Sequence, residues 1–326
     1  MSTATRILVI RLSSIGDIVL TTPVIRYLYE QLEGPVEIHF LTKKSYSFLL
    51  EHHPMVFKVH TMERTIQEVI PDLMDVDFDY VIDLHSNIRS RIVKRRLKRL
   101  SFTFDKRNIQ KWIWVNFGIN WMPKEHVVDR YLKTLEAFSV KDDGKGLDYY
   151  CAPETRSPEG LPEKYIAVAV GAAHMGKRMD AERWSDLLLK VQYPVVLVGG
   201  KEDESTAAVI QDKVKGVFNW CGKLSVDESA LVVKGAEVVI SGDTGMMHIA
   251  AAFKKKIISL WGCTVPGFGM SPYRPNEHSV ILEPNFRKKR PCSKLGNRCK
   301  YGMANKCIHQ IEDEAILKAI ERLWVR

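Results

Sequence analysis

The chain's 326 residues exceed what one hydrophobic core usually organises, so the length predicts two domains. With 45% hydrophobic and 27% charged residues the composition is that of a globular protein, and no window approaches the roughly 18 apolar residues of a membrane-spanning helix. The net charge of +9 indicates an anionic partner: nucleic acid, phosphorylated glycolipid or membrane surface. Because no signal peptide is recognisable, we expect a cytoplasmic protein.

Short β-branched strands alternate with helical patterns along the whole chain. The first half predicts strands at 7–10, 36–41 and 80–84, and helices at 18–31, 45–52 and 90–100. A stretch rich in Pro, Glu and Gly at 151–164 then marks a domain boundary. The second half predicts strands at 165–170, 195–198, 237–240 and 256–260, and helices at 184–191, 206–213, 226–234, 246–252 and 311–324.

This βαβ alternation predicts an α/β protein with parallel sheets covered by helices on both faces. We expect two doubly wound, Rossmann-like domains, 1–155 and 156–326, that face a cleft, with 311–324 as a closing C-terminal helix. Ligands in such folds bind outside the carboxyl ends of the strands. Functional side chains are therefore expected just after residues 10, 84, 170, 198 and 240.

The first strand runs into the segment Arg11-Leu12-Ser13-Ser14-Ile15-Gly16-Asp17, after which a helix begins. Gly16 permits a tight turn, and the helix dipole favours an ionised carboxylate at Asp17. Such a carboxylate can accept a proton from a hydroxyl, so Asp17 is a candidate general base. Taken alone, Asp17 is better explained as an ordinary helix-start residue, because aspartate is common there.

Two familiar phosphate-binding loops are absent from the sequence. The turn after the first strand has one glycine where a dinucleotide fingerprint requires G-x-G-x-x-G, and G-x-x-x-x-G-K-[ST] does not occur. These absences argue against a nicotinamide dehydrogenase or a P-loop kinase.

A different phosphate site is indicated where the strand at 237–240 ends in Ser241-Gly242-Asp243-Thr244-Gly245-Met246-Met247-His248. Gly245 lets the backbone approach a ligand, Thr244 offers a hydroxyl, and free N–H groups of the following helix favour an anion. This arrangement could hold a diphosphate without a metal. We expect Asp243 to order the loop by accepting backbone N–H bonds, and His248 to face either the ligand or, more commonly, the core.

Two further strand ends carry charged residues. The loop after 165–170 contains Lys177 and Arg178, which could clamp a phosphate, although a solvated loop would look similar. The strand at 195–198 is followed by Gly199-Gly200 and by Glu202-Asp203-Glu204, whose carboxylates could accept hydrogen bonds from ribose hydroxyls.

Together these segments resemble the heptosyltransferases of glycosyltransferase family 9, which build the inner core of lipopolysaccharide. The resemblance spans nearly the whole chain and rests on these segments in register: Ser13-Ser14-Ile15-Gly16-Asp17 with Thr22-Pro23, Asp83-Leu84-His85 with Arg89-Ser90, Lys177 seven residues before Trp184, Gly199-Gly200 with Glu204, Asp243-Thr244-Gly245 with His248, and Gly262 with Thr264 and Pro266.

The resemblance implies the GT-B architecture, a metal-independent inverting transfer with no separate cofactor, and an ADP-heptose donor in the second domain. It casts Asp17 as the general base. On the donor side it implies Lys177 and Thr244-Gly245 at the diphosphate, Glu204 at the ribose, and Asp243 and His248 in the same segment.

On the acceptor side the resemblance implies Ser14, Gly16, His85, Asn87 and Arg89 as contacts of an anionic glycolipid, the lipopolysaccharide core, and no nucleic acid. The basic run 89–111 suits carboxylates and phosphates of such an acceptor, and a peripheral contact with the cytoplasmic face of the inner membrane is also expected. We interpret a second basic run, 287–290, as a solvated face.

The chain departs from the family pattern at two places. Ala172 and Ala173 stand where hydroxyl residues often precede the lysine, and His85-Ser86-Asn87 stands where many members carry a glutamine and a glycine. The first departure leaves only backbone to serve the phosphate there, and the second leaves the acceptor open.

Three cysteines, Cys292, Cys299 and Cys307, fall within sixteen residues and could ligate zinc together with His309. Their spacing does not match the C-x-x-C knuckles of structural zinc sites, so we favour a reduced basic segment and no metal. Cys151, Cys221 and Cys263 are expected to be structural.

Two other function classes remain open. One is a GT-B enzyme with another nucleotide-sugar donor, such as a hexosyltransferase or a nucleotide-sugar epimerase. The other is a non-catalytic protein that binds nucleotide or nucleic acid, which only the charge suggests. The sequence leaves the oligomeric state open.

Overall fold

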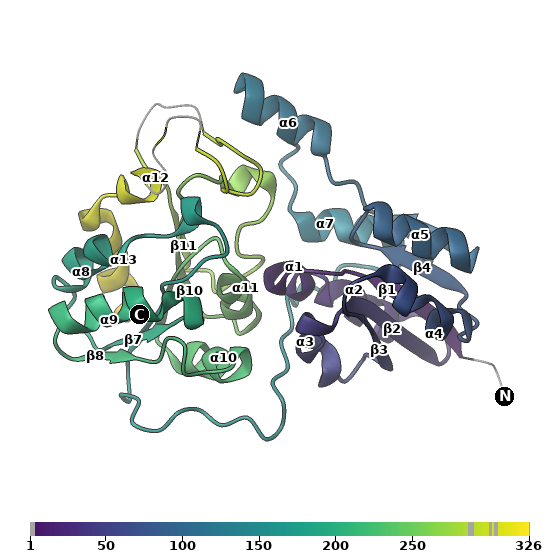
Figure 1. The fold of residues 1–326 in the computed structure, drawn as a ribbon, viewed down its shortest axis with the longest axis horizontal. Helices are drawn as coiled ribbons and strands as arrows, with labels where there is room; N and C mark the ends of the chain where they lie inside the picture. The colour runs from purple at the N-terminus through teal and green to yellow at the C-terminus, as the bar shows by residue number, and fades with distance from the viewer. Residues whose placement is uncertain (1–3, 286–289, 300–301, 303–305, 326) are drawn as a thin grey trace. The chain divides into compact units, whose positions relative to one another are not determined.

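The structure is a computed structural model that describes residues 4–285, 290–299, 302 and 306–325. The chain forms two compact units. One comprises Met1–Lys106 and Glu125–Pro153, and the other comprises Arg107–Lys124 and Glu154–Arg326 (Figure 1). Residues 107–124 were expected in the first domain, but they pack with the second unit.

The first unit is built on a five-stranded parallel sheet with the strand order β3-β2-β1-β4-β5. Its strands are β1 (Thr5–Ile10), β2 (Val36–Lys43), β3 (Lys58–Met62), β4 (Tyr80–Asp83) and β5 (Leu100–Thr103). The chain winds outward to one side of β1 and then returns to begin β4 on the other side. The loops after β1 and β4 therefore meet at the topological switch point, where doubly wound sheets bind ligands.

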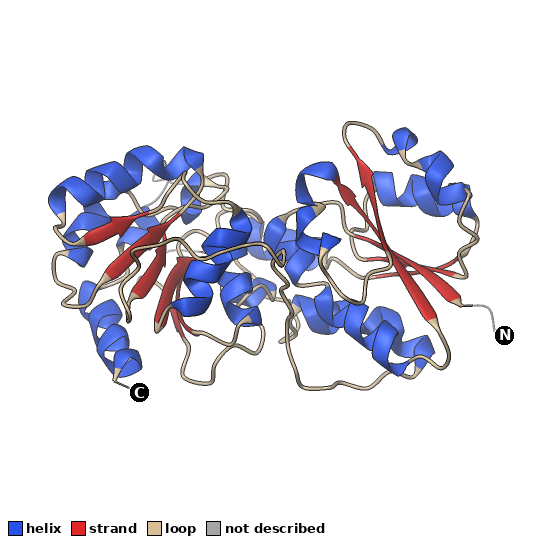
Figure 2. Cartoon of the chain, turned by 90° about the horizontal axis from the view of Figure 1, so that it is seen from below, coloured by secondary structure: helices blue, strands red, loops and turns tan. Residues whose placement is uncertain are grey.

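Helices cover both faces of this sheet (Figure 2). They are α1 (Ile15–Val19), α2 (Thr22–Gln31), α3 (Phe48–Glu51), α4 (Ile70–Met74), α5 (Ile88–Leu97) and α7 (Val127–Leu132), with 3-10 turns η1 (Lys44–Tyr46), η2 (Ile66–Glu68) and η3 (Lys133–Phe138). The single helix expected at 18–31 is two helices. Pro23 lies in the first turn of α2, where a backbone N–H has no partner within the helix, so its missing N–H costs nothing. In the interior of one continuous helix, the same position would need that N–H as a hydrogen-bond donor.

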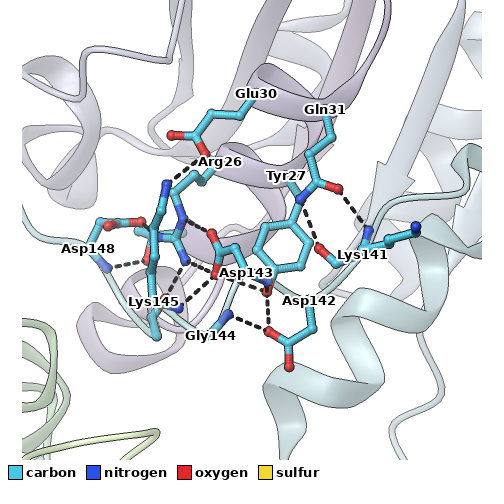
Figure 3. A network of polar contacts seen from close by, with 12 residues as sticks. Arg26, Tyr27, Glu30, Gln31, Lys141, Asp142, Asp143, Gly144, Lys145 and Asp148 are labelled. Carbon is cyan, nitrogen blue, oxygen red and sulfur yellow. Dashed lines mark hydrogen bonds and ion pairs between the residues drawn. The ribbon is translucent and has the colours of Figure 1, made fainter.

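The end of the first unit is attached to α2 by a buried cation. The side chain of Arg26, 2% exposed, forms ion pairs with Asp143 and Asp148 and donates to the carbonyl of Gly146. Tyr27 adds a hydrogen bond of 2.6 Å from its hydroxyl to Asp142. Figure 3 shows Asp143 and Asp148 beside the guanidinium of Arg26. Residues 141–148, far away in sequence, are thereby fixed on α2.

The second unit contains a six-stranded parallel sheet with the order β11-β10-β9-β6-β7-β8. The strands are β6 (Ile166–Ala169), β7 (Val195–Val198), β8 (Val217–Asn219), β9 (Val238–Gly242), β10 (Lys256–Leu260) and β11 (Val280–Leu282). The switch point lies between β6 and β9. The central strands are buried on both faces, as all-parallel sheets require.

The helices of the second unit are α6 (Asn108–Phe117), α8 (Ala181–Leu188), α9 (Glu204–Lys213), α10 (Val226–Gly235), α11 (Gly245–Ala252), α12 (Lys306–His309) and α13 (Asp313–Trp324), with 3-10 turns η4 (Met175–Lys177), η5 (Lys201–Asp203) and η6 (Pro266–Phe268). The expected closing helix is α13, whose apolar face joins the core formed by β6, β7, β9 and β10. Among the described residues, no helix is long and apolar enough to cross a membrane.

Candidate functional site

At the switch point of the first unit, the buried Arg11 connects the ends of β1 and β4. Its Nη1 donates to the carbonyl of Leu84 at 2.6 Å and to the hydroxyl of Tyr131 at 3.0 Å. Its Nη2 lies 2.6 Å from Oδ1 of Asp17. The guanidinium therefore holds the Asp17 carboxylate directly beside the two strand ends.

The other oxygen of Asp17 is held by Ser14. Oδ2 accepts hydrogen bonds from the backbone N–H and the hydroxyl of Ser14, at 3.2 and 3.0 Å. Burial alone would raise the pKa of Asp17, but Arg11 and these hydrogen bonds outweigh it and hold the pKa below its usual value. The side chain is still 25% exposed, so the ionised carboxylate is partly open to solvent.

The loop after β4 places His85 beside this cluster. Oδ1 of the buried Asp83 accepts from the backbone N–H groups of His85 and Ser86, and its Oδ2 pairs with Lys94 at 3.0 Å. Burial, followed by the repulsion of Arg11 and Lys106, lowers the pKa of His85 to about 4. His85 is therefore neutral at neutral pH, and within the described residues its buried Nδ1 has no hydrogen-bond partner.

The remaining acceptor candidates have different surroundings. Asn87 caps α5, because its Oδ1 accepts from the backbone N–H of Ser90 at 3.0 Å. Arg89 is exposed in the first turn of that helix. Gly16 is buried inside α1, whereas Ser14 is exposed and directed at Asp17. Asp17, Ser14 and His85 are thus gathered at one switch point, while the side-chain oxygen of Asn87 already accepts a hydrogen bond from the helix.

At the switch point of the second unit, Lys177 of η4 meets Asp243 of the loop after β9. Their Nζ and Oδ2 atoms lie 2.6 Å apart, and the side chains are 17% and 9% exposed. Oδ2 of Asp243 also accepts a hydrogen bond from the hydroxyl of Thr264 at 3.0 Å. The carboxylate was expected to accept backbone N–H bonds, but within the described residues it contacts an ammonium and a hydroxyl instead.

Thr244 and Gly245 form the start of α11. The hydroxyl of Thr244 caps the helix by accepting from the N–H of Met247 at 3.4 Å, and it contacts Ser241 Oγ at 2.9 Å. Gly245 is the first residue of the helix. His248 is only 2% exposed, so its side chain faces the core, which was the commoner of its two expected fates.

A buried carboxylate, Asp203, organises the ends of β6 and β7. Its Oδ2 accepts the N–H of Gly200 at 2.9 Å, and a Cβ on Gly171 would lie 1.9 Å from that oxygen. Arg178 turns toward Asp203 at 3.7 Å. Glu204, the first residue of α9, is exposed and lies against Gly222, where a Cβ would come within 2.1 Å of its Oε1. The close approach of both carboxylates depends on glycine.

The cysteines of the C-terminal segment lie close to Cys263. The Cys263 thiol hydrogen-bonds to Cys307, and this contact together with burial raises the pKa of Cys263, which keeps the thiol protonated. All six cysteines are free thiols. His309 lies beside Asp180, with 3.3 Å between its Nε2 and the backbone nitrogen. Across the described ranges, no three or more His, Cys, Asp or Glu side chains form a group able to hold a metal.

The second basic run is described only at Arg290, since residues 286–289 lie outside the described residues. Arg290 donates to the carbonyl oxygens of Trp261, Gly262 and Thr264 and pairs with Glu283 at 3.2 Å. For Arg290 the interpretation as a solvated face was wrong, because its guanidinium donates hydrogen bonds to carbonyl oxygens of the loop after β10.

Comparison with known proteins identifies the family. The model of glycosyltransferase family 9 (heptosyltransferase) matches residues 66–300. The chain belongs to glycosyltransferase family 9. Lipopolysaccharide heptosyltransferase 1 of Campylobacter coli is 25% identical over 98% of this chain and 99% of its own length.

Solved structures share the fold. A family 9 glycosyltransferase from Veillonella parvula covers the whole chain with a TM-score of 0.78 and 21% identity, over 99% of its own length. ADP-heptose lipopolysaccharide heptosyltransferase II of Escherichia coli covers 98% of this chain and 99% of its own with a TM-score of 0.70 and 18% identity. The expected α/β, GT-B fold of a family 9 glycosyltransferase is therefore confirmed.

Several residues of this family 9 site had no recognised role in the sequence. Arg11 directly follows a buried strand, a position that could have marked it, but Tyr131 lies 120 residues further along and gives no local signal. Asp203 was one of three adjacent carboxylates, and only its burial distinguishes it from Glu202 and Glu204.

Proposed function

We propose that this family 9 enzyme transfers heptose from ADP-heptose to the inner core of lipopolysaccharide, with inversion, without a metal, and with Asp17 as general base. The observation that carries the proposal is the position of two charged pairs. Arg11 with Asp17 and Lys177 with Asp243 each occupy the switch point of their own sheet, where doubly wound folds bind ligands.

Asp17 has the properties of a base for an acceptor hydroxyl. Its pKa is held low, so it is ionised at neutral pH, and a quarter of the side chain is exposed. The proton of the acceptor hydroxyl passes to Asp17 as the acceptor oxygen bonds to the anomeric carbon of the donor. The bond from that carbon to the diphosphate breaks, and ADP leaves. A single displacement of this kind inverts the configuration at the anomeric carbon.

The low pKa of Asp17 also limits what it can do. A carboxylate so stabilised is a weak base, so it is suited to take the proton only as the new bond forms. Arg11 then has two functions: it keeps Asp17 ionised, and it fixes the carboxylate in position through Leu84 and Tyr131. Positioning of the reacting groups is expected to supply much of the rate enhancement.

On the donor side, Lys177 supplies the positive charge for the departing diphosphate. The backbone N–H groups at Gly245, the first residue of α11, add hydrogen-bond donors beside it. We expect Glu204, which is exposed at the start of α9, to accept hydrogen bonds from ribose. With a lysine and a helix N-terminus at the leaving group, no divalent cation is required, and we expect activity to persist in excess EDTA.

The heptose donor and the lipopolysaccharide acceptor come from the relatives, whose names state these activities. Mass spectrometry of core oligosaccharide from a strain that lacks this protein tests both at once. We expect a core truncated by heptose, restored by the parent gene and not by one that encodes Asp17→Asn. An unchanged glycan would refute the assignment.

The donor nucleotide can be tested separately on the purified protein. Thermal-shift curves with ADP, UDP and GDP should show the largest stabilisation with ADP. If UDP or GDP stabilised the protein as strongly as ADP, the ADP-heptose assignment would be abandoned in favour of another nucleotide-sugar donor.

A further inference from the structure

Residues 107–124 leave the first unit, form α6 within the second unit and return to the first; we call them the α6 segment (Figure 1). The sequence of α6 is apolar, Asn-Ile-Gln-Lys-Trp-Ile-Trp-Val-Asn-Phe, yet none of its ten residues is buried. An apolar helix normally covers a core, so its exposure needs an explanation.

One face of the α6 segment packs on the second unit. Trp114 and Val115 contact a small cluster formed by Met122, Val265 and Phe268. The indole of Trp114 lies so close to the backbone of η6 that a Cβ on Gly267 would come within 2.5 Å of it. These contacts hold the segment in place and define which side of it is turned away.

The other side carries large apolar residues that are exposed to solvent. Ile109 is 72% exposed and Trp112 is 51% exposed on α6, and Trp121 is 65% exposed beyond it. Phe117 and Ile119 are also exposed. These five side chains fall within thirteen consecutive positions, a density that no other stretch of the described residues reaches. Scattered surface hydrophobics are ordinary, but a cluster of this density marks an interaction surface.

The charge of the α6 segment is entirely positive. It contains Arg107, Lys111 and Lys124 and no aspartate or glutamate, in a chain that is itself at +9. Lys111 lies 5.7 Å from the centre of the Phe268 ring, on the packed side, and Lys124 is exposed at the end of the segment. In sequence, the half-buried Arg107 precedes the apolar surface and the exposed Lys124 follows it.

We propose that the α6 segment docks this protein on an anionic phospholipid surface. Tryptophan prefers the boundary between lipid headgroups and acyl chains, and cations beside it are attracted to anionic lipids. A lipid surface fits better than a protein groove. The α6 segment has no acidic residue that could pair with the cations of a protein partner, and its exposed apolar side chains lie on a short helix and the residues that follow it. The choice of a membrane also rests on the proposed glycolipid acceptor.

The test is co-sedimentation of the full-length protein with two kinds of vesicle. One is phosphatidylcholine alone, and in the other about one lipid in three is the anionic phosphatidylglycerol. We expect binding to the anionic vesicles that weakens as salt is raised, because salt screens the attraction. Trp112→Ser with Trp121→Ser should reduce binding about tenfold or more. The matched control, Phe57→Ser with Leu189→Ser, removes two exposed apolar residues elsewhere and should bind like the parent.

A second variant guards against a folding defect. Lys124→Glu changes one exposed charge without touching the packed face, and it should weaken binding to anionic vesicles only. The proposal is overturned if the parent does not bind anionic vesicles, or if the control pair loses binding as strongly as the tryptophan pair. It is also overturned if the tryptophan pair still binds vesicles but, in sedimentation velocity, dissociates a dimer that the parent forms.

This test separates docking from the proposed function. Activity on a delipidated, water-soluble core acceptor should be unchanged in the tryptophan pair, because neither residue belongs to the site. A parent that binds vesicles but transfers no heptose to that acceptor would refute the function and leave the docking surface standing.

Discussion

The ion pair between Lys177 and Asp243 predicts opposite effects of two substitutions on ADP binding. Nζ of Lys177 lies 2.6 Å from Oδ2 of Asp243, and both side chains are mostly buried. A diphosphate bound at Lys177 shares this ammonium with a carboxylate that repels it. Lys177→Met should therefore weaken ADP binding, whereas Asp243→Asn should strengthen it.

The magnitudes follow from the contacts. A hydrogen bond from a charged group is worth about 1.5–3 kcal/mol, so Lys177→Met should raise the Kd for ADP about 10- to 150-fold. Asp243→Asn removes the negative charge that competes with the diphosphate for Lys177, so it should lower the Kd for ADP. Asparagine can still accept the hydrogen bond of the Thr264 hydroxyl, so the loop after β9 should keep its conformation.

Isothermal titration with ADP measures both effects on folded protein. Lys215→Met is the matched control, because Lys215 is an exposed lysine of the same unit. It should leave the Kd unchanged. Equal ADP affinity of Lys177→Met and the parent would refute the donor site, and so would an Asp243→Asn variant that loses affinity as strongly as Lys177→Met.

Two predictions concern the stability of the first unit. Arg26→Met leaves two partly buried carboxylates without their buried cation and should cost about 3–5 kcal/mol in the free energy of unfolding. Lys145→Gln removes an exposed ion pair and should cost far less. Comparable losses for the two variants in urea titrations would contradict this. Burial lowers the pKa of His53 and His60 from 6.5 to about 4. The unfolded chain therefore binds protons first as the pH falls below 6.5, and stability should drop by about 2 kcal/mol per histidine at pH 5. A melting temperature that stays constant from pH 7 to 5 would contradict that expectation.

The central strands could be predicted from the sequence because each is a short β-branched run buried on both faces. β7 and β10 begin and end where they were expected, at Val195–Val198 and Lys256–Leu260. The strands that were missed, β3, β5, β8 and β11, are the four edges of the two sheets. An edge strand such as β5 is largely solvent-exposed and follows a helix after two residues, so it has no apolar run to mark it.

Candidate site residues could be named from the sequence where they lie next to strand ends, and not where they depend on contacts between distant segments. Lys177 and Asp243 became candidates because each follows a predicted strand, whereas the role of Asp17 and the choice of His85 came from the family resemblance. The partners that set their chemistry come from elsewhere in the chain, as Tyr131 does for Arg11. Likewise, only residues 107–111 of the α6 segment were considered, as the end of a basic run, because sequence alone does not reveal which face of a helix remains exposed.

The role of Asp17 as the general base is tested most directly by the rate of heptose transfer by Asp17→Asn, with Asp72→Asn as the matched control. Asp72 is likewise an aspartate in the first turn of a helix of the first unit, but it is exposed and has no proposed role. We expect Asp17→Asn to lower kcat by about 10²- to 10⁴-fold with an unchanged Kd for ADP, and Asp72→Asn to behave like the parent. A folded Asp17→Asn variant that retained more than about a tenth of the parent kcat would contradict the role of Asp17 as the general base.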